Sequence, residues 1–259
     1  MSEDFDGPEI PRSTYVTSLL MLQQRGFAAR TFIDVGAAEG AFFLARRETD
    51  LFPGARHFFI DAMQENEAVY RKLAGKFGTG HEIAAVSSME GRVNLRIDPD
   101  FYNTHIDYLQ PSGKYPSVRE VPVTTLDQVV ARHALEPPFA LKLDVQGGEL
   151  DALRGALRTL QQATVVTAEI QIFSERDTLV ELLGFMQGLG FALYDLSDLG
   201  YYPSDGTLYQ CYATFIPKRM DFRRDIPWVQ PGKEQAVLAL LRERRANNLQ
   251  AIDELIGNT

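Results

Sequence analysis

The chain has 259 residues and a single cysteine, Cys211, so no disulfide can form within it. This scarcity fits a reducing compartment, and the acidic stretch at 1–11 lacks the apolar core of a secretory signal. We therefore expect a cytoplasmic protein. Cys211 lies in an apolar, strand-like run over 208–216, where we expect a buried structural thiol.

Long apolar runs are also missing, since no stretch approaches the roughly 18 to 20 apolar residues that cross a bilayer. Positive charge is scarce, with 26 Lys and Arg against 35 Asp and Glu, a net charge of −9 and no dense basic block. Nucleic acid and anionic membrane surfaces are therefore unexpected partners. Hydrophobic residues still make up 45% of the chain, enough to build a full core without disulfides or structural metals.

Apolar runs with strand character alternate with segments of helical spacing along most of the chain. This alternation predicts an α/β fold with a mostly parallel sheet, helices on both faces and an antiparallel last strand, which only a loop precedes. We expect a helical extension over 1–30, a main domain over 31–218 with an insertion at 92–124, and a helical extension over 219–259. The expected strands are 31–35, 57–60, 82–86, 92–97, 118–124, 139–145, 164–172, 191–196 and 209–216. The expected helices are 12–24, 39–47, 64–77, 149–160, 179–189 and 233–256.

The first expected strand runs into Asp34-Val35-Gly36-Ala37-Ala38-Glu39-Gly40 and then into a helix. Small residues let a ligand approach the backbone, and the helix N-terminus offers free N–H groups. The glycine spacing is not the G-x-G-x-x-G of dinucleotide folds, and the acid before Gly36 would repel a pyrophosphate. The same acid suits a cationic amino group. The loop therefore favours S-adenosylmethionine, which carries an ammonium and a carboxylate but no phosphate.

An acid also ends the second expected strand. Asp61 lies about 25 residues past Gly36, where dinucleotide folds place the carboxylate that accepts hydrogen bonds from ribose hydroxyls. We expect Asp61 to contact the cofactor, together with Ala62 beside it and with Ala85 and Val86 at the end of the third strand. The alternative is structural, with a tight turn at Gly36 and a helix-capping acid at Asp61.

Further motifs carry a resemblance to a known family. They are Val121 to Asp127 (VPVTTLD), Leu141 to Leu150 (LKLDVQGGEL), Leu153 to Ala156 (LRGA) and Ala168 to Ile170 (AEI). With these motifs the chain resembles the FkbM-type methyltransferases over roughly residues 31–195. The resemblance implies a Rossmann-like class I methyltransferase fold, dependence on S-adenosylmethionine, and methylation of oxygens on sugars, polyketides or surface glycans.

The resemblance also implies roles for single residues. Asp34, Gly36 and Gly40 would hold the amino-acid end of the cofactor, and Asp61 its ribose; we add Ala37 to the expected cofactor contacts. The chain departs from the family at three places. The family usually has Asn where Ala38 stands, Glu-Pro where Asp61-Ala62 stands, and Glu where Gln146 stands. The carboxylate is kept at Asp61, whereas Gln146 removes a charge beside the expected active site.

In the strand order that the resemblance implies, Asp34, Asp144 and Glu169 converge at one edge of the sheet. Lys142 shares a strand face with Asp144, and its burial needs an acid partner, either Glu169 or Asp144. We expect Asp144, Lys142 and Glu169 to be catalytic, with Asp144 as first candidate for the base that removes a hydroxyl proton. His105 is the second candidate, because an ordinary histidine pKa of about 6.5 suits proton transfer near neutrality.

Structural alternatives stay open for this group. Lys142, Asp144 and Glu149 together fit an ion-pair and helix-capping cluster, and His105 fits an ordinary loop residue. Magnesium held by Asp144 and Glu169 is possible but not favoured, because no tight ligand spacing demands it. We therefore expect no metal.

Two aromatic-rich loops, at 98–118 and 200–206, are candidates for the substrate site. Tyrosine offers a flat apolar face and a hydroxyl, which suit a sugar ring, although these rings could also pack the loops onto the sheet. The leading hypothesis is an O-methyltransferase acting on a sugar or glycan. A polyketide or other natural-product acceptor, or a non-catalytic cofactor-binding protein, are the alternatives, and a homo-oligomer is possible. The expected substrate contacts are Tyr102, Tyr108, Tyr201 and Tyr202.

Overall fold

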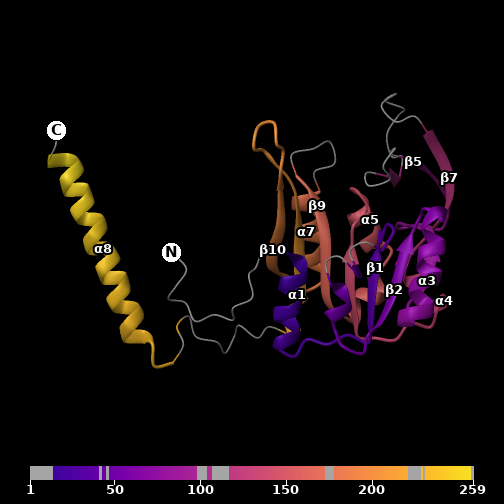
Figure 1. Ribbon diagram of the computed structural model, residues 1–259, viewed down its shortest axis with the longest axis horizontal. Coiled ribbons are helices and arrows are strands. Elements are labelled where there is room, and N and C mark those ends of the chain that lie inside the picture. The colour runs from indigo at the N-terminus through magenta and orange to yellow at the C-terminus, as the bar shows by residue number, and fades with distance from the viewer. Residues whose placement is uncertain are drawn as a thin grey trace. The chain divides into compact units, whose positions relative to one another are not determined.

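The computed structural model divides the chain into two units, Met1–Met220 and Asp221–Thr259, and each is described by itself (Figure 1). In the described part of the chain, the first unit contains both sheets and every helix except α8. The second contains a single long helix. The residues that the structure describes are 14–40, 43–44, 47–97, 104–106, 117–172, 178–220, 229 and 231–257.

A seven-stranded sheet forms the centre of the first unit, and Figure 1 shows β10, β9, β1 and β2 following one another across it. All neighbouring strands run parallel except β11, which is antiparallel to both β9 and β10. This arrangement confirms the predicted α/β class and the antiparallel last strand. In spatial order the strands are β10 (Phe191–Tyr201), β11 (Leu208–Pro217), β9 (Ala163–Gln171), β8 (Phe139–Leu143), β1 (Thr31–Val35), β2 (Arg56–Asp61) and β3 (Gly80–Ile83).

Helices cover both faces of this sheet, as the alternation of side chains along β2 illustrates. Phe58 and Ile60 belong to the largest apolar cluster, which includes residues of α4, α5, α6 and α7, whereas Phe59 packs on the other face against Tyr70 and Leu73 of α3. The helices of this unit are α1 (Tyr15–Gln24), α3 (Glu67–Phe77), α4 (Leu126–Arg132), α5 (Glu149–Arg154), α6 (Leu157–Gln161) and α7 (Leu179–Gly188), with short 3₁₀ turns at Glu48–Asp50, Gln64–Asn66 and Lys218–Met220.

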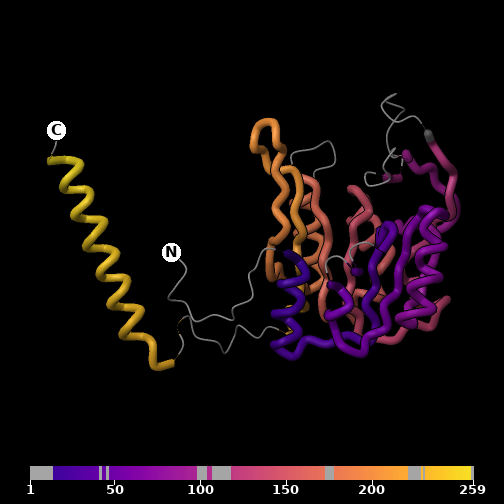
Figure 2. Tube along the Cα trace, viewed as in Figure 1, coloured from indigo at the N-terminus to yellow at the C-terminus, as the bar shows by residue number. Residues whose placement is uncertain are grey.

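Helix α1 lies beside the hairpin formed by β10 and β11. Figure 2 shows the indigo helix next to the orange hairpin, and the hydroxyl of Ser18 donates a hydrogen bond to Asp195 of β10. Cys211 of β11 is buried in the main core, which confirms the predicted structural thiol. Helix α1, which precedes the first strand, is thereby hydrogen-bonded to β10 at the end of the sheet.

A second, smaller sheet has the order β4–β7–β5–β6 and its own apolar cluster. The prediction of one strand over 82–86 is wrong, because the chain changes sheets there. The Ala84 amide bonds to the carbonyl of Asp61, and Ala85 then pairs with Val123 of the second sheet. These strands are β4 (Ala85–Val86), β5 (Gly91–Ile97), β6 (His105–Ile106) and β7 (Ser117–Thr124).

The single helix expected over 149–160 is two helices, broken at Gly155. A Cβ at Gly155 would lie 2.1 Å from the carbonyl oxygen of Ser87, so this position accepts only glycine. After the break, the carboxylate of Asp127 caps α6 by accepting hydrogen bonds from the amide and hydroxyl of Thr159 at 2.8 and 2.7 Å. The LRGA and TTLD motifs thus have structural roles. Helix α4 has no counterpart among the expected elements. Of the helix expected over 39–47, the structure describes 39–40, 43–44 and 47, and of these only Phe43 and Leu44 are helical.

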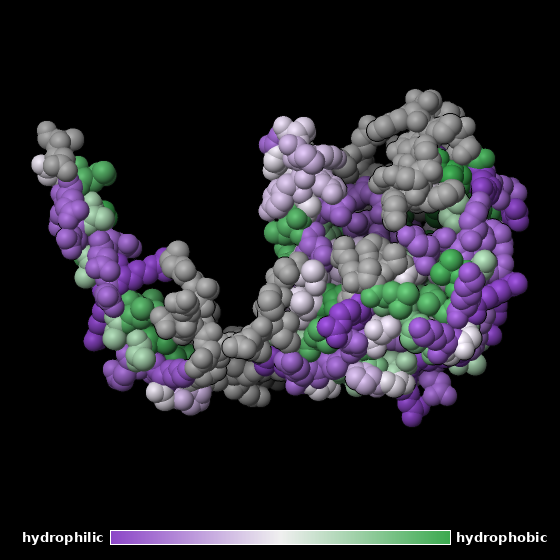
Figure 3. Space-filling view, in the orientation of Figure 1, coloured by the Kyte–Doolittle hydropathy of each residue, from purple (hydrophilic) through white to green (hydrophobic). Residues whose placement is uncertain are grey.

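The second unit contains α8 (Glu234–Gly257), close to the helix expected over 233–256. None of its residues is buried, and Figure 3 shows apolar green side chains mixed with hydrophilic purple ones along it. The partner of its apolar stripe stays a prediction. Across the described part of the chain, no helix combines the length and hydropathy needed to cross a membrane. Within α8, the most exposed large apolar side chains are Leu255 and Ile256.

Candidate active site

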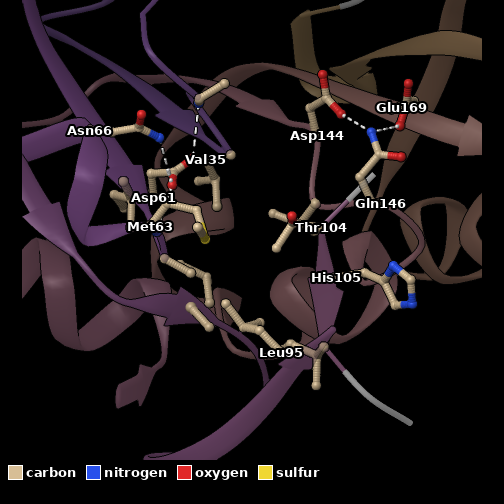
Figure 4. Close-up of a pocket in the computed structure, with 18 of the residues that line it drawn as sticks. Val35, Asp61, Met63, Asn66, Leu95, Thr104, His105, Asp144, Gln146 and Glu169 are labelled. Carbon is tan, nitrogen blue, oxygen red and sulfur yellow. Dashed lines mark hydrogen bonds between the residues drawn. The ribbon is translucent and has the colours of Figure 1, made fainter. Parts of the chain in front are cut away.

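A cavity of about 530 Å³ lies between the carboxyl edge of the main sheet and the second sheet. This volume is in the range of small-molecule sites. Figure 4 shows Asp61 and Asn66 at one end and a polar group of Asp144, Gln146 and Glu169 at the other. The cavity thus joins the predicted cofactor end to the predicted catalytic end. Its other lining residues are Val35, Gly36, Ala38, Glu39, Ile60, Ala62, Met63, Ala84, Ala85, Val86, Leu95, Thr104, His105, Ile106, Val145, Gln210 and Tyr212.

The two ends meet because β1 and β8 are adjacent and in register, with Val35 opposite Leu143. The chain leaves both strands at the same height, and Gly36 has a φ of +78°. A Cβ there would lie 1.8 Å from the carbonyl oxygen of Asp144. Gly36 is therefore required for close backbone approach, as its motif predicts, but the group that approaches is the neighbouring strand end.

The glycine loop faces the cavity with only part of its length. Gly36, Ala38 and Glu39 line the cavity, whereas Ala37 and Gly40 do not. Ala37 is buried in the apolar cluster of α3, and Gly40 lies against the side chain of Leu73. The predicted cofactor contacts at Ala37 and Gly40 therefore find no support in the cavity wall.

Ala38 adopts a φ of +47°, a left-handed conformation that Asn and Gly tolerate better than Ala. Its amide donates to Asp61 Oδ2 at 2.9 Å, and its carbonyl accepts a hydrogen bond from the Tyr70 hydroxyl. These contacts from both sides hold the strained turn in place. The positive φ of Ala38 gives a physical reason for the Asn that the family usually has here.

Asp61 lies at the end of β2 and lines the cavity. Ala62, Ala85 and Val86, which the sequence also assigns to the cofactor, line the cavity as well. Asp61 Oδ1 accepts hydrogen bonds from the Met63 amide at 2.7 Å and Asn66 Nδ2 at 3.2 Å, in addition to the Ala38 amide on Oδ2. A carboxylate accepts about four hydrogen bonds, so one place remains for a ligand hydroxyl. Burial raises the pKa of Asp61 to about 6, although these hydrogen bonds lower it.

Asp34 and Lys142 form a buried ion pair beneath the cavity, with Asp34 Oδ1 3.0 Å from Lys142 Nζ. Neither side chain lines the cavity, so the structure gives Asp34 a charge partner instead of the predicted cofactor amino group. Asp144, one of the two acids predicted to pair with Lys142, is the second acid beside it, with Oδ2 3.6 Å from Lys142 Nζ. Burial raises the pKa of Asp34 and the Lys142 ammonium opposes that rise. Burial acts to lower the pKa of Lys142, but the nearby carboxylates hold it above its ordinary value.

Asp144 receives hydrogen bonds from the loop that follows it and from a distant strand. The Tyr212 hydroxyl of β11 donates to Oδ2 at 2.5 Å, and Gln146 Nε2 donates to Oδ1 at 3.0 Å. The Gln146 amide also donates to Glu169 Oε2 at 3.0 Å, so it lies between two carboxyl groups. Gln146 has a φ of +56°, a strained conformation of the kind that persists at functional sites. Because the Gln146 side chain is a neutral amide, it can donate to both carboxyl groups. A glutamate at this position would instead repel them.

Glu169 of β9 is 3% exposed and lies among other acids. Burial raises its pKa to about 10, and the negative charges of Asp144 and Glu149 add to the rise. Glu169 therefore carries its proton at neutral pH. It can donate a hydrogen bond to a ligand, but it cannot serve as the base.

Glu149 begins α5 and is fully buried below the loop that precedes it. Its Oε1 accepts hydrogen bonds from the Val145 amide at 2.9 Å and the Gly147 amide at 3.2 Å. Burial raises the pKa of Glu149 to about 7. These contacts fit the structural alternative for Glu149, because its carboxylate holds the loop that carries Gln146.

His105 of β6 lines the cavity next to Thr104 and Ile106. Figure 4 shows it apart from the group formed by Asp144, Gln146 and Glu169. Within the described residues, no three His, Cys, Asp or Glu side chains are grouped closely enough to hold a metal ion.

The predicted tyrosine contacts are only partly visible. Tyr102 and Tyr108 lie outside the described residues. Tyr201 and Tyr202, at the end of β10, are 52% and 43% exposed and do not line the cavity. Tyr202 instead packs against Tyr209, with 4.7 Å between ring centroids. Among the described tyrosines, Tyr212 lines the cavity, and its place follows from its pairing opposite Glu169 in the sheet, a register that the sequence pattern does not specify.

Comparison with known proteins gives a family and distant structural neighbours. An FkbM methyltransferase from Methylobacillus flagellatus has a TM-score of 0.44 and 17% identity, over 71% of this chain and 43% of that one. Fibrillarin from Aeropyrum pernix, solved with natively bound S-adenosyl-L-methionine, has a TM-score of 0.43 and 12% identity, over 77% and 74% of the two chains. A precorrin-6y C5,15-methyltransferase from Geobacter metallireducens has a TM-score of 0.38 and 12% identity, over 76% and 85%.

This chain therefore spans less than half the length of the M. flagellatus protein. The search of curated proteins found no match. The family comparison is more specific, because the methyltransferase FkbM domain matches residues 34–193, which is more than half of the chain. The chain belongs to the FkbM methyltransferase family, for which S-adenosylmethionine is the implied methyl donor.

Proposed function

We propose that the chain transfers a methyl group from S-adenosylmethionine to a hydroxyl oxygen of a sugar or glycan. The observation that carries this proposal is the Asp144 carboxylate at the cavity wall, 9% exposed and fixed by donors on both oxygens. Methylation of a hydroxyl needs a group that removes the hydroxyl proton at the moment of transfer. Asp144 supplies such a group in a cavity large enough for small molecules.

The cavity fits S-adenosylmethionine at its other end. Asp61 keeps one accepting place for a ribose hydroxyl, and Ala62, Met63, Ala85 and Val86 give an apolar wall beside it. When bound, the cofactor supplies a methyl group already activated by a positive sulfonium, which leaves positioning and proton removal to the protein.

Charge decides which nearby group can be the base. Lys142 is held as a cation and Glu169 holds its proton, so neither accepts a proton at neutral pH. Asp144 has a cation 3.6 Å from Oδ2, and the Gln146 amide on Oδ1 leaves that oxygen able to accept one more hydrogen bond. In this proposal, Oδ1 takes the proton of the acceptor hydroxyl. His105 stays the second candidate, since it lines the same cavity.

The wall around Asp144 favours an acceptor with several hydroxyl groups. Gln146, Glu169, Gln210 and Tyr212 all line this end, and together they offer both donors and acceptors of hydrogen bonds. A sugar ring presents hydroxyl edges that use such groups. The net charge of −9 disfavours a free phosphorylated acceptor.

The proposal is tested by incubating the protein with methyl-labelled S-adenosylmethionine and a panel of free sugars, nucleotide-linked sugars, glycans and polyketides. We expect labelled product from a sugar-containing acceptor. Asp144→Asn should lower turnover by about 10²- to 10⁴-fold, the usual contribution of a general base, with unchanged binding of S-adenosylhomocysteine.

The matched control is Asp151→Asn, which makes the same change in a carboxylate that pairs with Arg154 at the surface. It should keep full turnover. Labelled polyketide with no labelled sugar would refute the acceptor class. Full turnover in Asp144→Asn, with loss of turnover in His105→Gln, would move the base to His105.

A further inference from the structure

Tyr212 reaches the catalytic end from β11, outside the segment 34–193 that matches the family. Its backbone pairs opposite Glu169 in the antiparallel part of the sheet, and its side chain is 2% exposed. The hydroxyl donates to Asp144 Oδ2 at 2.5 Å. We propose that Tyr212 is a positioning residue that orients Asp144 for proton transfer, an inference that rests on the proposed function.

The orientation of the Asp144 carboxylate has to be fixed by its hydrogen-bond partners. The terminal torsion of an aspartate side chain is broad, so the side chain alone does not choose which oxygen faces the acceptor. Tyr212 and Lys142 both lie at Oδ2, whereas Gln146 donates to Oδ1. The Tyr212 hydroxyl and the Lys142 cation occupy the side of Oδ2, which leaves Oδ1 to accept from the acceptor hydroxyl.

Tyr212 is itself held by the helix that precedes the family segment. Its ring packs on the ring of Tyr15, with centroids 4.8 Å apart, and Tyr15 is fully buried with its hydroxyl donating to Glu48. The Tyr15 amide donates to Asp198 of β10 at 2.6 Å. Helix α1 and the β10–β11 hairpin therefore act together as the support of Tyr212.

The hydroxyl of Tyr212 stays a donor over the working pH range. Burial raises its pKa well above the ordinary value, and the nearby charge of Asp144 adds to this. A neutral phenol beside a carboxylate makes a charge-assisted hydrogen bond, which is stronger and more directional than a neutral one. A small misplacement of a reacting group costs about a hundredfold in rate, so loss of this bond should act on turnover.

The test is Tyr212→Phe, which keeps the ring packed on Tyr15 and removes only the hydroxyl. With the acceptor found in the labelling panel, we expect kcat to fall about ten- to a hundredfold. The acceptor KM and the affinity for S-adenosylhomocysteine should change by less than about threefold, because the bond to Asp144 acts on orientation more than on binding. The control is Tyr209→Phe, the same change on the same strand in a ring that packs against Tyr202.

A second measurement needs no acceptor and no stable variant at Tyr212. Proton NMR of the full chain should show a far-downfield resonance from the Tyr212 hydroxyl, present in Tyr209→Phe and absent in Asp144→Asn. A wild-type spectrum without such a resonance, or full kcat in Tyr212→Phe, overturns the inference.

The variant Asp144→Asn separates this inference from the proposed function. If Asp144→Asn is inactive while Tyr212→Phe keeps full kcat, only the positioning role fails. If Asp144→Asn keeps full kcat, the assignment of the base fails, and the positioning role fails with it.

Discussion

Lowering the pH from about 7 to about 5 should weaken the binding of S-adenosylhomocysteine, the demethylated cofactor, by about tenfold. The reason is Asp61, whose pKa burial raises to about 6. The carboxylate form accepts a ribose hydroxyl, and the protonated form gives up part of that capacity. With a pKa of about 6, roughly nine-tenths of Asp61 is ionised at pH 7 and roughly one-tenth at pH 5, and this ratio sets the expected change.

Calorimetry across this pH range measures the effect directly. Asp61→Asn should bind about ten- to a hundredfold more weakly at neutral pH, because a charge-assisted hydrogen bond is worth about 1.5–3 kcal/mol, and its affinity should not depend on pH. Glu149 is a buried acid with a pKa of about 7 that does not line the cavity, so Glu149→Gln serves as the control and should keep the tenfold change. An affinity that is flat between pH 5 and 7 in the wild type would refute the ribose contact at Asp61.

Three substitutions and one control variant test the framework by urea unfolding. Gly36→Ala should cost at least about 3 kcal/mol, because its Cβ meets a backbone oxygen, whereas Gly54→Ala, at a φ of +85° with open space around it, should cost only about 1 kcal/mol; equal losses would contradict this account. Asp127→Ala should cost about 1–2 kcal/mol, because the amide and hydroxyl of Thr159 lose their cap, and a neutral result would remove the capping role. Burial raises the pKa of Glu149 from 4.5 to about 7, so the wild type should lose stability as pH rises through this range; Glu149→Gln should flatten that loss and gain about 2 kcal/mol at about pH 8, and parallel pH profiles would argue against it.

The parts of the fold that the sequence predicts are those with local causes. β1 is buried at every position, and its apolar run ends at Gly36, where the chain must turn with a positive φ. Asp61 follows from the same local pattern at the end of β2. In each case the residue that decides the structure lies within a few positions of the element that it ends.

Contacts across the sheet are harder to predict, because they depend on register between segments far apart in sequence. Tyr212 lies 68 residues from Asp144, and only the pairing of β11 with β9 brings its hydroxyl to the site. The same limit applies to the change of sheet after Ala84, which depends on pairing with Val123. A strand pattern fixes which side of the sheet a residue faces, but not which residue it meets there.

Asp34 shows how a motif can leave the partner of an acid undecided. An acid beside a glycine loop suits a cationic ligand, yet the structure pairs it with Lys142 of the neighbouring strand, because both side chains point from adjacent register positions into the same buried layer. A buried lysine requires compensation by acids, and Asp34 lies nearer to it than Asp144, at 3.0 against 3.6 Å. Asp34 is therefore the nearer of these two acids that offset the lysine charge.

This account predicts that Asp34→Asn acts on turnover and not on the cofactor. The substitution keeps the shape of the side chain but leaves Lys142 with Asp144 and Glu48 as its acids, which should tighten its pairing with Asp144, weaken Asp144 as a base and lower turnover by about tenfold or more. Affinity for S-adenosylhomocysteine should stay within about twofold, measured on protein whose melting curve shows that it is folded, since removing one partner of a buried pair costs about 3–5 kcal/mol. If affinity instead falls tenfold while turnover at saturating cofactor is kept, Asp34 holds the cofactor after all. The charge of Lys142 would then have to be compensated by Asp144 and Glu48 without it.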